Sequence, residues 1–167
     1  MMKPYLIDSD ALIDSQRDYY KRANFQPIWD CIQKNAEVIK PVYNELVIPN
    51  SPLGAWVKNN YKNKILDIAD PDVLKEYRLI QNWIQTCGFW TAPGYTQWSS
   101  PDKADPWLIA MAKVKGFVIV SHERSRPAMD INRPSKKEPK ITTVAKQFGV
   151  PVIPVFQMLY DVNLCVH

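Results

Sequence analysis

Acidic side chains stand just after two short apolar segments and at the start of a helical one. Asp8 follows residues 5–7, Glu123 comes after the apolar run 117–121, and Asp105 opens an apolar helical segment. In an open parallel sheet the carboxyl ends of the strands share one edge, where such sheets bind ligands. Carboxylates gathered there repel one another unless a cation is present, and hard divalent cations prefer oxygen ligands. The pattern therefore predicts a magnesium or manganese site.

Asp8 and Asp10 lie two residues apart, a spacing that points both side chains the same way in an extended chain. Either aspartate also suits the N-cap of a helix that begins near Ala11. For Asp10 the cap and the metal role are equally good interpretations. For Asp8, at the end of the strand, we expect a ligand.

Asp105 has the same two interpretations, because it is followed by Pro106. An aspartate N-cap with proline at the first helical position is a common way to begin a helix and requires no function. The two roles are compatible, since a capping carboxylate has a second oxygen for a cation.

Three further polar residues carry weaker local signals. Asp102 is expected to be a turn residue, and His122 a surface residue rather than a base. Glu45 lies in a predicted helix, where most glutamates are simply solvent-exposed. Other chemistries are poorly supplied, because the chain has no glycine-rich phosphate loop, no His-Glu-x-x-His and no Cys-x-x-Cys.

A basic segment follows the second acidic strand end. Between residues 124 and 140 there are six Lys and Arg residues, two acidic residues and three prolines, which predicts an irregular exposed loop. A solvated surface explains such a run as well as RNA binding does. Because the loop starts beside Glu123, we expect contacts with phosphates, made by Arg124, Arg126, Lys136 and Lys137.

Helices and short apolar segments alternate along the chain, which predicts a parallel sheet covered on both faces. Strands are expected at 4–8, 38–41, 117–121 and 150–153. Helices are expected at 25–36, 42–47, 53–57, 72–86, 106–115, 141–149 and 156–160, with a loop over 90–103. No linker divides the chain, so we expect one α/β domain over residues 1–167.

The overall composition is ordinary for a globular protein. Hydrophobic residues make up 46% and charged residues 23% of the 167 positions, and the net charge of +4 permits a nucleic-acid partner without requiring one. The three cysteines are widely spaced and odd in number, as in reduced cytosolic proteins. No apolar run reaches the length of a membrane span, and the N-terminus lacks a signal-peptide core, so a cytoplasmic protein is expected.

Taken in order, these segments resemble the PIN domain, the fold of many prokaryotic toxin ribonucleases. Residues 5–13 are similar to its first-strand motif, with Asp8 as the first acid. Residues 42–46 match the region of the second acid, Glu45. Residues 105–112 are similar to the helix that carries the third acid, Asp105, and residues 118–123 resemble the strand ending in Thr-x-Asp. Glu123, where the family usually has aspartate, and the longer chain are departures from the family pattern.

The resemblance implies a three-layer α/β/α sandwich with a central parallel sheet and a magnesium- or manganese-dependent endoribonuclease. Its catalytic and metal-binding residues would be Asp8, Glu45, Asp105 and Glu123. Ser9, Asp10 and Ser121 would orient these carboxylates or a water. The implied setting is a type II toxin–antitoxin pair, with RNA as substrate, an antitoxin as protein partner and a homodimer as one possible assembly.

Two alternatives remain open. One is a PIN-like RNA- or protein-binding module that has lost catalysis, an interpretation that Glu123 favours and the three retained acids oppose. The other is a phosphatase or deoxyribonuclease that uses the same acids.

Overall fold

The computed structural model describes residues 4–124 and 128–164. Its sheet has four parallel strands: β1 (Tyr5–Ile7), β2 (Ala36–Glu37), β3 (Val118–Val120) and β4 (Val152–Ile153). The strand order is β2-β1-β3-β4, so the chain adds strands on either side of β1. β1 pairs with β3 through Tyr5–Val118, Leu6–Ile119 and Ile7–Val120. The order reverses between β1 and β3, which is where an open α/β sheet leaves a crevice at its carboxyl edge.

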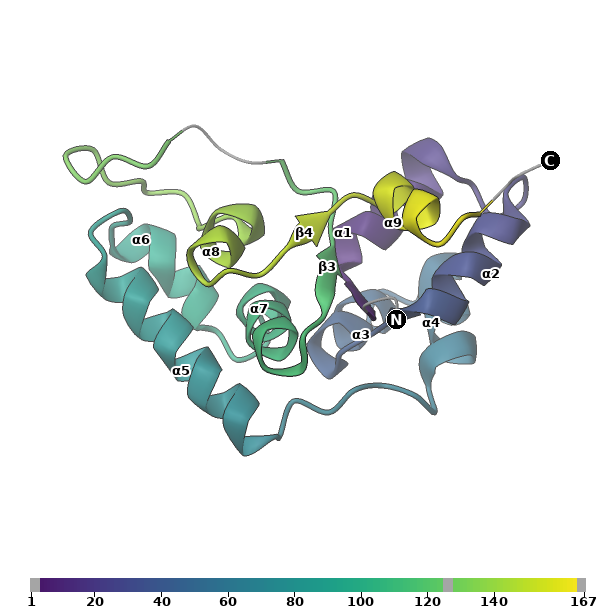
Figure 1. The fold of residues 1–167 in the computed structure, drawn as a ribbon, viewed down its shortest axis with the longest axis horizontal. Helices are drawn as coiled ribbons and strands as arrows, with labels where there is room; N and C mark the ends of the chain where they lie inside the picture. The colour runs from purple at the N-terminus through teal and green to yellow at the C-terminus, as the bar shows by residue number, and fades with distance from the viewer. Residues whose placement is uncertain (1–3, 125–127, 165–167) are drawn as a thin grey trace.

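Helices cover both faces of the sheet, giving a three-layer α/β/α sandwich (Figure 1). In that view α5, α6, α7 and α8 lie to the left of the sheet, and α2, α4 and α9 lie to its right. The helices of the described residues are α1 (Ser9–Asp14), the π-helix η1 (Ser15–Tyr19), α2 (Gln26–Asn35), α3 (Lys40–Val47), α4 (Pro52–Tyr61), α5 (Pro71–Thr86), α6 (Ala92–Tyr95), the 3₁₀ helix η2 (Thr96–Ser99), α7 (Ala104–Lys115), α8 (Ile141–Gln147) and α9 (Val155–Asp161).

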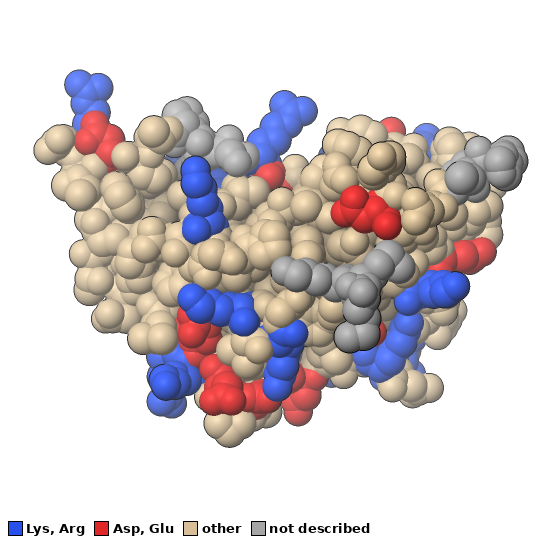
Figure 2. Space-filling view, in the orientation of Figure 1, with Lys and Arg blue, Asp and Glu red and all other residues tan. Residues whose placement is uncertain are grey.

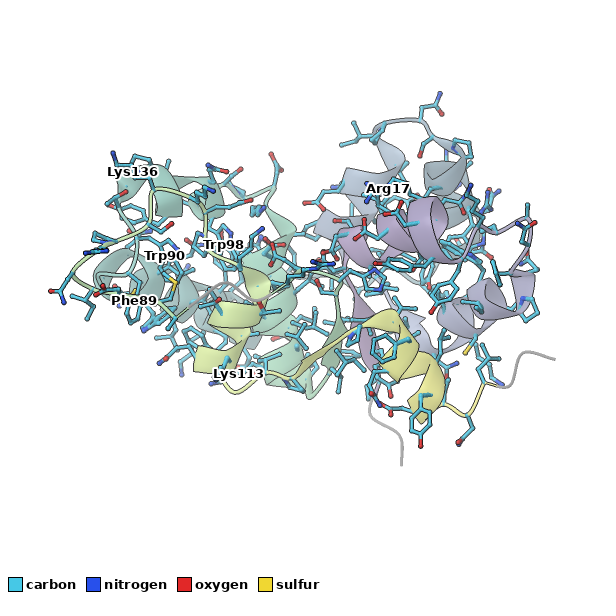
Figure 3. All side chains as sticks on the ribbon, turned by 90° about the horizontal axis from the view of Figure 1, so that it is seen from above. Arg17, Phe89, Trp90, Trp98, Lys113 and Lys136 are labelled. Atoms are coloured by element: carbon cyan, nitrogen blue, oxygen red, sulfur yellow. The ribbon has the colours of Figure 1, made fainter. Side chains whose placement is uncertain are left out.

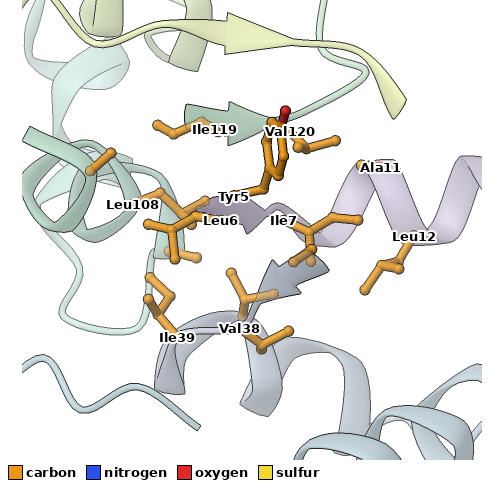
Figure 4. Close-up of a cluster of buried hydrophobic side chains, with 14 of the residues drawn as sticks. Tyr5, Leu6, Ile7, Ala11, Leu12, Val38, Ile39, Leu108, Ile119 and Val120 are labelled. Atoms are coloured by element: carbon orange, nitrogen blue, oxygen red, sulfur yellow. The ribbon is translucent and has the colours of Figure 1, made fainter. Parts of the chain in front are cut away.

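The core is built around β1, whose three residues are all buried. Leu6 and Ile7 are fully buried and lie between side chains of β3 and the segment after β2, as Figure 4 shows. Leu108 of α7 packs over the same strand, and residues 106–112 of α7 are all buried. Strands that are apolar on both sides are what a sheet covered by helices on both faces requires.

Local signals account for the ends of several helices. Asp70 caps α5 through bonds from the N–H groups of Asp72 and Val73. Ser51 caps α4 in the same way, through the N–H of Gly54. α7 ends at Gly116, whose φ of 77° is in the left-handed region that favours glycine.

Most predicted elements are confirmed, but several differ from the prediction, among them the helix expected at 53–57, which runs over Pro52–Tyr61, and the unpredicted η1. The second strand forms at 36–37 rather than 38–41, because the next helix already begins at Lys40. Residues 90–103 are not a plain loop but contain α6 and η2. The first helix begins at Ser9 rather than near Ala11.

Two of the three cysteines, Cys31 and Cys87, are free thiols, and Cys165 lies outside the described residues. None of the helices within residues 4–124 and 128–164 combines the length and the apolar character that crossing a membrane requires.

Candidate functional site: an acidic cluster at the carboxyl edge

Asp8 is the centre of an acidic cluster at the junction of β1 and β3. Its side chain is 4% exposed, and its Oδ1 accepts a hydrogen bond from the Ser9 N–H at 2.7 Å. Asp8 is thus both the N-cap of α1 and a carboxylate at the strand end. The cap that the sequence allowed at Asp8 or Asp10 is at Asp8.

Ser121 connects Asp8 with Asp10 across the strand junction. Its Oγ lies 3.2 Å from Asp8 Oδ2 and 3.1 Å from Asp10 Oδ1. The hydroxyl has a single proton and donates to one carboxylate at a time. When Asp8 is protonated it can donate to Ser121, which then donates to Asp10. Ser121 is therefore placed between the two carboxylates, and Asp10 lies in the cluster beside Asp8.

Ser9 joins the cluster to α3. Its Oγ lies 2.7 Å from Glu45 Oε2 and 3.4 Å from Asp8 Oδ1. Glu45 is exposed, as its local sequence predicts, yet its carboxylate is held against the residue that follows Asp8. The structure thus brings together the first two acids that the resemblance singled out.

Asp105 lies within electrostatic reach of the same group. It is not the N-cap of α7, because the helix begins one residue earlier, at Ala104 with Lys103 as N-cap. Its Oδ2 is 3.3 Å from Lys103 Nζ, and that ammonium is also 2.9 Å from Glu138 Oε2. Burial opposes the charged form of Lys103, but Asp105 and Glu138 raise its pKa above the ordinary value.

The cluster is electrostatically strained in the absence of a cation. Burial raises the pKa of Asp8 well above its usual range, and the charges of Asp10 and Asp105 add to the effect. Burial also raises the pKa of Asp105 to about 7, with Lys103 opposing and Glu123 adding to the rise. Carboxylates that resist ionisation together are the situation in which a bound cation is stabilising.

Glu123 points to a different partner. Its Oε1 is 2.7 Å from Lys140 Nζ, and its Oε2 accepts from the Ile141 N–H at 2.6 Å. Ile141 is the first residue of α8, so Glu123 holds the start of that helix in place. Glu123 is still near enough to Asp105 to raise its pKa.

The donor set fits a hard divalent cation, since every candidate ligand is a carboxylate oxygen. Within the described part of the chain, no three acidic, histidine or cysteine side chains yet converge on one point as they do around a bound metal. Asp8, Asp10, Glu45 and Asp105 are the residues placed to hold one. Glu123 would first have to leave Lys140.

Sequence reasoning missed the cations that compensate this cluster. Lys103 is two residues from Asp105 and could have been noticed, but Lys140 lies at the end of an irregular loop whose path has no local signature. His122 was expected on the surface, which is wrong. Its side chain is only 13% exposed, and its Nε2 accepts from the Val155 N–H at 3.4 Å.

The other predicted residues are placed as follows. Asp102 lies in a turn, as predicted. Arg124 is exposed beside Glu123, and Arg126 lies outside the described residues. Lys136 and Lys137 follow Ser135, which exchanges backbone hydrogen bonds with residues 89 and 91. Figure 3 accordingly shows Lys136 at the end of the molecule that carries Phe89 and Trp90.

The fold and the site define an α/β protein with a carboxylate cluster, centred on the buried Asp8, at the topological switch point of a parallel sheet. The chain belongs to the family described as Domain of unknown function (DUF4411), whose model matches residues 5–164. No match was found among curated proteins.

Proposed function

We propose that this protein is a PIN-like, magnesium- or manganese-dependent endoribonuclease. The observation that carries the proposal is that Asp8, Asp10 and Asp105 lie within electrostatic reach of one another at the switch point, with Glu45 tied to Asp8 through Ser9. A purely structural cluster would gain nothing from carboxylates that raise one another's pKa. A site that holds a cation does.

The chain's residues have distinct roles in this proposal. Asp8, Glu45 and Asp105 hold the cation, and Ser9 and Ser121 keep two of these carboxylates oriented. A metal bound here supplies an activated water and positive charge for the scissile phosphate. Lys103, which already balances Asp105, keeps the local charge from becoming more negative when the cation is absent.

Contacts with the RNA backbone would come from the basic loop. Arg124 begins it beside the cluster, and Lys136 and Lys137 lie farther along the molecule. On the face drawn in Figure 2, Lys and Arg side chains stand apart or beside acidic ones rather than in one continuous patch. Affinity for RNA should therefore come from a few phosphate contacts and fall with added salt.

The remaining parts of the proposal rest on the resemblance to toxin ribonucleases. They are a role as the toxin of a type II toxin–antitoxin pair, a cognate antitoxin as partner, a cytoplasmic location and a possible homodimer. A catalytically inactive PIN-like RNA- or protein-binding module is the second candidate. It is favoured by one observation, the engagement of both Glu123 oxygens by Lys140 and Ile141.

The test is end-mapping of total cellular RNA incubated with the purified protein and manganese. Total RNA is used because an enzyme specific for one RNA would leave a generic oligonucleotide intact. Asp8→Asn keeps the capping oxygen and removes the charge, and Asp30→Asn is a matched control on the exposed side of α2. New ends that require manganese, disappear with Asp8→Asn and persist with Asp30→Asn are expected. No new ends from folded protein would favour the binding module.

A further inference from the structure

A cavity of about 380 Å³ opens directly beside the acidic cluster. Its wall combines η1, the end of β3, the start of α8, β4 and the start of α9. Ser121 and Glu123 line it, and Ser121 also bonds Asp8 and Asp10. The size is at the lower end of the roughly 300–1,000 Å³ typical of small-ligand pockets. One ligand could therefore reach the cluster and fill the cavity.

The rim of this cavity carries aromatic rings that the core does not use. Tyr19 is 56% exposed and Phe156 is 62% exposed. The Tyr19 ring lies edge-on to His122, with centroids 5.4 Å apart and an angle of 74°. The part of the wall formed by β4 and the start of α9 is apolar. Exposed aromatic rings around an apolar hollow are the arrangement on which nucleobases stack.

Two residues of the wall also carry polar atoms that the protein leaves unpaired. His122 accepts at Nε2 from Val155, so its neutral imidazole carries the proton on Nδ1. Among the described residues that Nδ1 has no hydrogen-bond partner, and the nearest carboxylate oxygen, on Asp14, is 3.9 Å away. Thr142 Oγ1 likewise has no partner in the part of the chain that the structure describes. Both atoms are closed off from solvent, so the ligand of this cavity is selected by its exposed rings and apolar wall rather than by these two groups.

We infer that this cavity holds one unpaired nucleobase of a single-stranded RNA whose backbone lies at the acidic cluster. The inference rests on the proposed function and adds which part of the substrate is recognised. Charge favours a base over an anionic group, because Glu123 lines the cavity and a neutral ring is not repelled. Continuity with the cluster through Ser121 places the base next to the phosphate to be cleaved. A duplex does not fit, because its bases are stacked within it.

The experiment measures binding of a short, fluorescent, single-stranded oligoribonucleotide, with calcium in place of manganese so that binding is separated from cleavage. Three proteins are compared: wild type, Phe156→Ala and Tyr160→Ala. Tyr160 is the matched control, since it lies on the same helix, is 78% exposed and does not line the cavity. A set of oligonucleotides, each with one abasic position, is titrated in parallel. Thermal unfolding confirms that each variant is folded.

Phe156→Ala should weaken binding of the intact strand by roughly 5- to 150-fold, the range for losing one stacked base. Tyr160→Ala should leave the affinity within about twofold of wild type. At one abasic position wild type and Phe156→Ala should bind equally, because the base that fills the cavity is then missing. Equal affinity of wild type and Phe156→Ala for every strand would overturn the inference. An equal loss of affinity in Phe156→Ala and Tyr160→Ala would also overturn it. A cavity that binds a protein segment instead would give the first of these results.

Cleavage by the same proteins is scored separately with manganese. RNA cleavage without any effect of Phe156 or of abasic positions would leave the ribonuclease proposal standing and remove the base subsite. If Phe156→Ala weakens binding of the intact strand but not of one abasic strand, and no RNA is cleaved, the base subsite stands and the protein is an RNA-binding module.

Discussion

Replacing Asp105 with Asn should stabilise the metal-free protein at neutral pH, although the same change should weaken metal binding. Burial raises the pKa of this carboxyl to about 7, Lys103 opposes the rise, and Glu123 adds to it. The folded protein therefore binds a proton at this position more tightly than the unfolded chain does. Asparagine has nearly the shape of the protonated form and carries no charge to bury.

The sign of the pH dependence follows from this difference. The stabilising contribution of a protonated Asp105 is fully present below its ordinary pKa of 3.8 and is lost as pH rises to about 7. At about 1.36 kcal/mol per pKa unit, the rise from 3.8 to about 7 sets an upper limit on the effect. Above neutral pH, the ionised Asp105 destabilises the metal-free fold by at most about 4 kcal/mol relative to an uncharged side chain. Because Asn also loses the ion pair with Lys103, we expect a gain on the order of 2 kcal/mol, or about 4–8 °C in Tm.

The assay is thermal and urea unfolding in chelator, across the range from about pH 5 to about pH 8. Wild type should lose stability as pH rises, whereas Asp105→Asn should lose less, so the difference between the two should narrow toward the acid end. Asp30→Asn, at an exposed position, should follow wild type throughout. Manganese should raise the Tm of wild type at the alkaline end and have a smaller effect on Asp105→Asn. A flat wild-type profile together with a less stable Asp105→Asn at about pH 8 would refute the reasoning.

Three further predictions concern the site and its support. Lys103→Met should raise the pKa of Asp105 further, because it removes the charge that lowers it; carboxyl-carbon NMR titration without metal would measure this, and an unchanged titration would show that the ion pair does not form. Gly54→Ala should destabilise by about 1–3 kcal/mol, since the new Cβ would meet the backbone carbonyl oxygen of Leu46. If Gly54→Ala unfolded at the same urea concentration as wild type, helices α3 and α4 would separate at little cost. Leu6→Ala should cost about 2–5 kcal/mol in the same assay, because Leu6 is fully buried in the central strand. A loss of stability below about 1 kcal/mol would show that the core readily closes the space left by the removed Leu6 side chain.

The sequence determined the order of strands and helices and the fold class, because these depend on local patterns of apolar residues. The short run before Asp8 is a buried strand, and the apolar segment from Asp105 onward is a buried helix. Errors occurred where two local signals competed. Pro41 suits both a strand end and the first turn of a helix. In the structure it lies in the first turn of α3, and β2 therefore begins two residues earlier than predicted.

Local sequence patterns could identify candidate acidic residues, but they could not predict which residues these acids contact. Glu45 has no local distinction, and only the resemblance pointed to it. Its importance depends on Ser9, which is 36 positions away in sequence and 2.7 Å away in space. For Asp105 the sequence offered a helix cap, whereas the structure shows a carboxyl in the first turn, bound to Lys103.

The sequence by itself determined which carboxylates stand at strand ends, since the end of an apolar run is a local property. Only the tertiary structure decided that Ser121 would lie between Asp8 and Asp10, because that contact spans more than a hundred residues and depends on β3 pairing with β1. It also decided that Glu123 would hold α8 and that His122 would line a cavity with little of its side chain exposed. The physical reason is that burial and charge, which set the pKa of a carboxyl, are properties of the assembled neighbourhood and not of the chain segment that carries it.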